Sequence, residues 1–239
     1  MKLDILAFGA HPDDVELSCG GTLIVHAQKG YKTGVVDLTR GEMGTRGTSD
    51  QRMEEAADAG RIMQLSVREN LYMEDSWFVN DAEHQKAVVR MIRKYQPEIV
   101  LANAPYDRHP DHGKGARLVE DAFFKAGLKM LETFDEAGRP QEPWRPKKLY
   151  HYIQSVSIQP DFLVDISAGM AKKMEAIRAY KTQFFNPSAS GPDTYISSPA
   201  FIKMIESRAQ EFGHRIQVDY AEGFVQSQFL GVSDLFHLV

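Results

Sequence analysis

Residues 3–14, LDILAFGAHPDD, form an apolar run of strand length that ends in a histidine and two carboxylates, a pattern typical of the first strand of an α/β sheet. Three more strand-like runs follow, and helical patterns separate them. The predicted strands are residues 3–9, 33–38, 68–73 and 97–103, and the predicted helices are residues 50–65, 81–95 and 113–128. This alternation predicts an α/β fold in which helices cover both faces of a mostly parallel sheet.

The last third of the chain is less regular. Its predicted strands are residues 148–153 and 161–166, and its predicted helices are residues 168–183 and 199–212. Residues 138–148 contain three prolines, and residues 186–199 are rich in small and turn-forming residues. Both stretches are long enough to be lids or interface arms. The proline-rich stretch 138–148 could mark a domain boundary. We interpret it as a surface loop instead, because neither flanking part is long enough to fold readily by itself, and we expect one domain over residues 1–239.

Composition excludes several classes of protein. The 239 residues carry a net charge of −5, which argues against general binding to nucleic acid or to an anionic membrane. No apolar run approaches the roughly 18 residues of a membrane span, and the apolar run at residues 3–10 is too short for a signal peptide. Cys19 is the only cysteine, which excludes intramolecular disulfides and thiolate zinc clusters. We expect Cys19 to be a packing residue and the protein to be cytoplasmic.

Two clusters of histidine and aspartate follow two of the predicted strands. His11 and the pair Asp13 and Asp14 come after the first strand, and the segment from His109 to His112 comes after the fourth. Either cluster alone would be explained by a turn or a helix cap. In a doubly wound sheet of order 3-2-1-4, however, the first and fourth strands are neighbours, and the loops at their carboxyl ends border the ligand crevice. We therefore expect the two clusters to face one another.

Imidazole nitrogen and carboxylate oxygen together suit a divalent metal. Catalytic zinc sites commonly use three protein ligands and keep one position open for water, so the remaining side chains are available for proton transfer. A dinucleotide site is the alternative at the level of the fold. The first turn lacks G-x-G-x-x-G, and its two carboxylates would repel a pyrophosphate.

A glycine-rich stretch, residues 41–47, follows the second strand. We interpret it as a wall of the crevice, in which Glu42 and Arg46 are candidates for contact with the substrate. The alternative is a plain glycine-rich turn.

Four motifs resemble those of a known family. They are AHPDDVE at residues 10–16, GGTL at residues 20–23, TRGEMGTRG at residues 39–47 and HPDH at residues 109–112. Together they resemble the PIG-L/LmbE-like metal-dependent N-acetylglucosamine (GlcNAc) deacetylases, and within them the bacillithiol-biosynthesis enzymes that act on N-acetylglucosaminyl malate. The resemblance covers about residues 1–130. It implies a Rossmann-like three-layer fold with strands 1 and 4 adjacent at the site, and a homohexamer.

The resemblance also implies roles for the clustered residues. His11, Asp14 and His112 would hold zinc, with iron as the alternative in the cell. Asp13 would be the general base that accepts a proton from water. His109, in its protonated form, would stabilise the tetrahedral oxyanion and assist departure of the amine.

Further roles follow from the same resemblance. Asp111 would orient His109, Arg52 and Arg108 would bind the carboxylates of a malyl group, and Tyr195 would close over the site. The expected function is hydrolysis of the N-acetyl group of a small GlcNAc conjugate. The alternatives are another GlcNAc-containing substrate, a non-haem iron oxygenase, since two histidines and a carboxylate also hold Fe(II), and a metal-dependent sugar-binding protein without catalysis.

Overall fold

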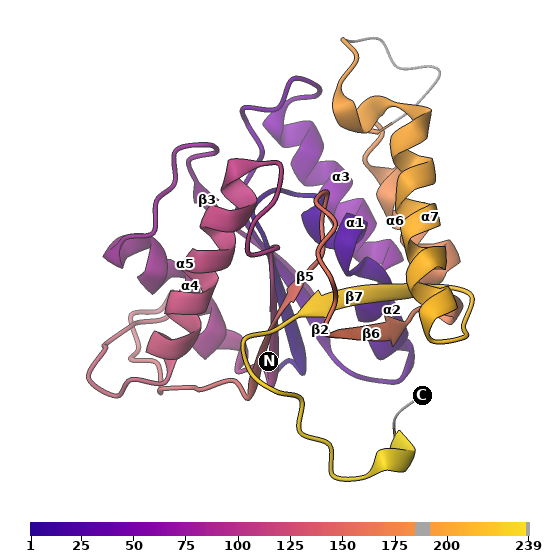
Figure 1. Cartoon of the computed structure of the whole chain (residues 1–239). Helices are drawn as coiled ribbons and strands as arrows, with labels where there is room; N and C mark the ends of the chain where they lie inside the picture. The colour runs from indigo at the N-terminus through magenta and orange to yellow at the C-terminus, as the bar shows by residue number, and fades with distance from the viewer. Residues whose placement is uncertain (185–191, 238–239) are drawn as a thin grey trace.

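The structure is a computed structural model that describes residues 1–184 and 192–237. A seven-stranded sheet of order β3-β2-β1-β4-β5-β7-β6 runs through it (Figure 1). The strands are β1 (Ile5–Gly9), β2 (Thr33–Thr39), β3 (Val67–Met73), β4 (Ile99–Ala102), β5 (Lys148–Tyr152), β6 (Phe162–Asp165) and β7 (Ala221–Val225). Strands β1 to β5 are parallel to one another, whereas β7 is antiparallel to both β5 and β6. The predicted α/β fold with β1 beside β4 is thus confirmed.

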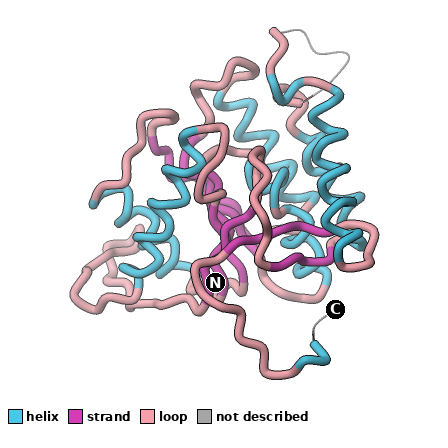
Figure 2. The backbone as a smooth tube through the Cα atoms, in the orientation of Figure 1, coloured by secondary structure: helices cyan, strands magenta, loops and turns pink. Residues whose placement is uncertain are grey.

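Helices form layers on both faces of the sheet, as Figures 1 and 2 show. They are α1 (Asp14–Ser18), α2 (Gly20–Gln28), α3 (Ser49–Ile62), α4 (Ala82–Tyr95), α5 (Pro110–Ala126), α6 (Met170–Ala179) and α7 (Pro199–Arg215). The pair α4 and α5 covers one face, and the other five helices cover the opposite face. Within the described residues, no helix is both long and apolar enough to span a membrane.

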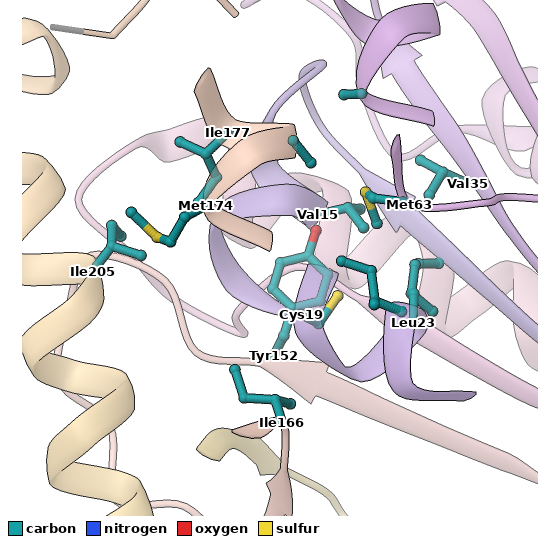
Figure 3. Close-up of a cluster of buried hydrophobic side chains, with 14 of the residues drawn as sticks. Val15, Cys19, Leu23, Val35, Met63, Tyr152, Ile166, Met174, Ile177 and Ile205 are labelled. Atoms are coloured by element: carbon teal, nitrogen blue, oxygen red, sulfur yellow. The ribbon is translucent and has the colours of Figure 1, made fainter. Parts of the chain in front are cut away.

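Alternate residues of β1 build two cores. Ile5 and Ala7 belong to the core under α2, α3, α6 and α7, and Leu6 and Phe8 belong to the core under α4 and α5. Figure 3 shows the first core, in which Cys19 is fully buried. The expectation that Cys19 is a packing residue is therefore confirmed.

Several element boundaries depend on details that periodicity does not reveal. Helix α3 begins at a capping box, where the Thr48 side chain accepts from the Gln51 backbone N–H and the Gln51 side chain accepts from the Thr48 backbone N–H. Helix α5 begins at Pro110 rather than at 113, so it includes most of the second polar cluster. Strand β7 lies where no strand was predicted.

The structure describes the predicted loop at residues 138–148 in full and the one at residues 186–199 in part. Residues 127–147 connect α5 with β5, so the predicted loop at 138–148 covers the second half of this connection and ends on the first residue of β5. Strand β4 pairs directly with β5. Of residues 186–199, the part from 186 to 191 lies outside the described residues. The suggestion that these loops act as lids or interface arms stays a prediction.

Candidate active site

The two polar clusters meet at the carboxyl ends of β1 and β4. Ala7 of β1 and Leu101 of β4 are direct partners in the parallel ladder, which brings the following loops together. The ring centroids of His11 and His109 are 4.8 Å apart, and those of His109 and His112 are 5.2 Å apart. The convergence expected from strand order is confirmed.

His11 presents one ring nitrogen to the site and uses the other as an anchor. Its Nε2 lies 3.0 Å from Asp75 Oδ1 and 3.4 Å from Asp111 Oδ2, and its Nδ1 lies 3.7 Å from Asp14 Oδ2. A proton on Nε2 directed to these carboxylates leaves the Nδ1 lone pair facing Asp14. Burial lowers the pKa of His11, but the bonds to Asp111 and Asp75 outweigh burial and raise it to about 10.

His112 has the mirror-image arrangement. Its Nδ1 lies 2.6 Å from Asp107 Oδ2, and its Nε2 lies 3.1 Å from Asp14 Oδ1. Burial lowers the pKa of His112, and the charge of Asp14 with the bond to Asp107 raises it to about 9. Both imidazoles therefore turn one nitrogen to Asp14 and the other to a carboxylate behind them.

Asp14 is the shared point of the cluster. Oδ2 accepts from the His11 backbone N–H at 3.0 Å and from Asn103 Nδ2 at 2.9 Å, and Oδ1 accepts from Gln154 Nε2 at 3.1 Å. Burial raises the pKa of Asp14, but the charges of His112 and His11 hold it well below its usual range. Asp14 is thus a buried, fully oriented carboxylate.

These residues fit a divalent cation. A metal-bound histidine usually donates its second ring N–H to a carboxylate, as both His11 and His112 do here. The ring nitrogens of His11, His109 and His112 also lie within 4.8 Å of one another. The donor set of imidazole and carboxylate is the one that zinc and iron accept.

Asp13 lies beside the cluster in an unusual backbone conformation, with φ of 115°. This region is costly for a residue other than glycine. Burial raises the pKa of Asp13 to about 7, and the Arg52 guanidinium, 3.4 Å from Oδ2, opposes part of that rise. The fold therefore holds a carboxyl group of nearly neutral pKa next to His11 and Asp14.

The side chain and the backbone of Asp111 have different partners. The Asp111 carboxylate contacts His11 and, at 2.8 Å, Lys114, while its bond to His109 comes from the Asp111 backbone N–H, 3.3 Å from Nδ1. In this arrangement the Asp111 carboxylate supports His11, and the contact of Asp111 with His109 is through its backbone N–H. Because Nδ1 of His109 accepts a bond, a neutral His109 carries its proton on Nε2.

Comparisons with known proteins agree with this geometry. The profile of the PIG-L family, described as GlcNAc-PI de-N-acetylase, matches residues 6–123. Diacetylchitobiose deacetylase of Thermococcus kodakarensis is 30% identical over 98% of this chain and 88% of its own length. The chain belongs to the PIG-L family.

Other proteins are similar to this PIG-L chain over most of its length. The conserved protein TT1542 from Thermus thermophilus superposes with a TM-score of 0.84 and 36% identity, over 97% of this chain and 98% of that one. A probable N-acetyl-alpha-D-glucosaminyl L-malate deacetylase 2 of Bacillus anthracis is 25% identical over 75% of this chain and 81% of its own length. A 4-oxalmesaconate hydratase of Pseudomonas putida is 29% identical over 74% and 73%.

An open cavity of about 310 Å³ lies over the PIG-L motifs. Arg46, Arg108 and Tyr195 line it, and the Arg108 guanidinium lies 4.4 Å from the centre of the Tyr195 ring. Arg52 also reaches the cavity, but it is buried and donates to the Gly41 and Pro12 carbonyls at 2.9 and 2.8 Å. Its two terminal nitrogens are therefore bound by the protein, whereas its buried Nε has no partner among the described residues.

Glu42 holds the loops together. Its carboxylate accepts from the backbone N–H groups of Arg40 and Asp75, and it is not among the residues that line the cavity. Glu42 thus fixes the loop that carries Asp75, which does not fit the expected contact with substrate.

Four residues of the site had no role predicted from the sequence: Asp75, Asp107, Gln154 and Arg208. Asp75 follows the carboxyl end of β3, and Asp107 follows that of β4, two residues before His109, so their position after a strand was the available signal. Gln154 and Arg208 come from the last third of the chain, where no motif indicated them.

Proposed function

We propose that this chain is a metal-dependent hydrolase that removes the N-acetyl group from a GlcNAc conjugate. The observation that carries the proposal is the arrangement of His11, Asp14 and His112, with Asp13 and His109 beside them in one cavity. Amide hydrolysis needs an activated water, an acid for the carbonyl oxygen and a proton for the departing amine. Three of these side chains would hold the metal, Asp13 would accept the proton of the water, and His109 would donate to the carbonyl oxygen.

His11, Asp14 and His112 would hold the metal, and zinc is the ion we propose, with iron as the alternative. A divalent cation at this position supplies Lewis-acid activation of the amide carbonyl and of a water molecule. Asp107 and Asp75 then fix the rings of His112 and His11 and increase the basicity of the ligating nitrogens.

Asp13 accepts the proton of the attacking water. Burial raises the pKa of Asp13 above that of an ordinary carboxyl group, which favours its uptake of that proton. As the water oxygen bonds to the carbonyl carbon, negative charge develops on the carbonyl oxygen, and Nε2–H of His109 donates to it. The carbon–nitrogen bond then breaks, the proton taken up by Asp13 passes to the amine nitrogen, and acetate and the free amino sugar leave.

We propose N-acetylglucosaminyl malate as the substrate. The motifs resemble the enzymes that act on it, and the relative in Bacillus anthracis bears that name. A cavity of about 310 Å³ is of a size that suits a small glycoside. The cytoplasmic location, the single domain and the homohexamer stay predictions.

An acetate-release assay on a panel of GlcNAc conjugates, with metal analysis of the same sample, tests the proposal. Asp13→Asn should lose roughly 100-fold or more in turnover and keep the metal. Asp58→Asn on the exposed surface of α3 is the matched control.

Three outcomes would contradict the proposal. Near-normal turnover of Asp13→Asn would remove the general base. Glycoside binding without acetate release by the metal-loaded protein would favour a sugar-binding protein, and oxygen consumption without acetate release would favour an oxygenase.

A further inference from the structure

One arginine of the cavity, Arg208, has no role in the chemistry above. It lies on α7, where the face formed by Phe201, Met204, Ile205 and Arg208 lines the cavity at helical spacing. Three of these side chains are apolar. Arg208 therefore brings the only charge of this helix face to the cavity wall.

Half-buried Arg208 makes fewer hydrogen bonds within the described residues than Arg52, Arg68 or Arg93. Arg68 pairs with two carboxylates, Asp37 and Glu16. Arg93 donates to three backbone carbonyls and one hydroxyl. In residues 1–184 and 192–237, the guanidinium of Arg208 makes one hydrogen bond, to the Gln154 backbone carbonyl, and no ion pair.

The charge of Arg208 remains uncompensated at close range. Burial lowers its pKa, and Glu222 and Asp107 act on it only through longer-range charge. A guanidinium nevertheless stays protonated at any ordinary pH. The N–H groups of Arg208 that have no partner among the described residues are not fully buried, so they are available to an anion that enters the open cavity.

Gln154 fixes Arg208 relative to the proposed metal ligands. The Gln154 side chain donates to Asp14 Oδ1 at 3.1 Å and accepts from Asn103 and from the Ala104 backbone N–H, while its carbonyl holds Arg208. One residue thus connects the guanidinium with the carboxylate at the reacting centre. Arg46 and Arg108 line the same cavity, and neither forms an ion pair within the described part of the chain.

We propose that Arg208 binds a carboxylate on the aglycone of the substrate and so determines specificity for anionic GlcNAc conjugates. This inference rests on the proposed function and deepens it. The cavity has an acidic end, at Asp13 and Asp14, and a set of arginines without carboxylate partners. A substrate with an amide at one end and a carboxylate at the other matches this distribution of charge.

Binding of the deacetylated products tests the inference without turnover. Calorimetry would compare glucosaminyl malate with methyl glucosaminide, which lacks the carboxylates, on the metal-loaded protein. The parent protein should prefer the malate compound about 10- to 100-fold, and Arg208→Gln should remove most of that preference. Arg208→Lys should keep part of it, because the charge remains but the fork of donors is lost.

Arg215→Gln is the matched control, since Arg215 lies on the same helix and pairs with Glu211 at 2.7 Å on the surface. It should leave both affinities unchanged. Steady-state kinetics should show the same pattern, with KM of Arg208→Gln raised about 10- to 100-fold for the malate conjugate and unchanged for the neutral one.

The possible results separate the two proposals. An unchanged preference in Arg208→Gln, an absent preference in the parent, or an equal loss on both ligands with a lower melting temperature would overturn the role of Arg208. A preference that depends on Arg208, together with no acetate release from any conjugate, would overturn the proposed function and leave the anion site in place.

Discussion

Replacing Asp75 with asparagine should weaken metal binding while it leaves all three proposed ligands intact. Asp75 Oδ1 lies 3.0 Å from His11 Nε2, and Oδ2 accepts from the Met43 backbone N–H at 3.0 Å. Asparagine keeps the volume and one acceptor but loses the charge that makes His11 more basic and fixes its ring. Removing such a partner costs about 10- to 100-fold in metal affinity.

The structure places the expected effect of Asp75→Asn near the lower end of that range. Asp111 Oδ2 lies 3.4 Å from the same nitrogen and remains as a weaker partner. We therefore expect a loss of about tenfold, which corresponds to about 1.4 kcal/mol. The double variant Asp75→Asn with Asp111→Asn should lose more metal affinity than either single variant, because neither carboxylate is then left beside His11 Nε2.

Competition between the metal-depleted protein and a fluorescent zinc indicator measures this affinity directly. Asp58→Asn serves as the control for an exposed aspartate. An affinity of Asp75→Asn within twofold of the parent would refute the role assigned to this carboxylate. A parent protein that cannot compete with the indicator at all would refute the metal site itself.

Two further changes test other parts of the site and its support. Arg52→Gln should lower kcat about tenfold or more and leave KM for the malate conjugate nearly unchanged, because Arg52 positions Asp13 and binds two backbone carbonyls. Steady-state kinetics would measure this effect, with Arg61→Gln on the same helix as the control. A raised KM with a normal kcat would instead identify Arg52 as a substrate ligand. Glu222→Gln should cost about 3–5 kcal/mol of stability, because Lys173 lies 2.6 Å away and both side chains are almost fully buried. Urea unfolding would measure that loss, and the double variant Glu222→Gln with Lys173→Met should regain part of it; a double variant less stable than the single one would contradict the reasoning.

Much of the fold was predictable because its signals are local. The buried parallel strands appear as short apolar runs, and the amphipathic helices follow the spacing of their apolar residues. The start of α3 could be predicted because Thr48 and Gln51 bond within one turn. Strand β7 could not be predicted, because Glu222 and Gly223 break the apolar pattern of a buried strand. Glu222 can be buried there only because two backbone N–H groups of α2 and the Lys173 side chain bind its carboxylate.

The amino-acid sequence identifies the residues of the cluster and the edge of the sheet where they meet, because the order of parallel strands fixes which loops lie side by side. The contacts of each side chain become known only from the folded structure. Asp75 reaches His11 across 64 positions of sequence, the Asp111 carboxylate turned out to support His11, and Arg208 was recognisable only once α7 had packed against Gln154. The physical reason is that a strand or helix is specified by neighbours along the chain, whereas an ion pair or an unpaired charge depends on which distant groups share the same buried space.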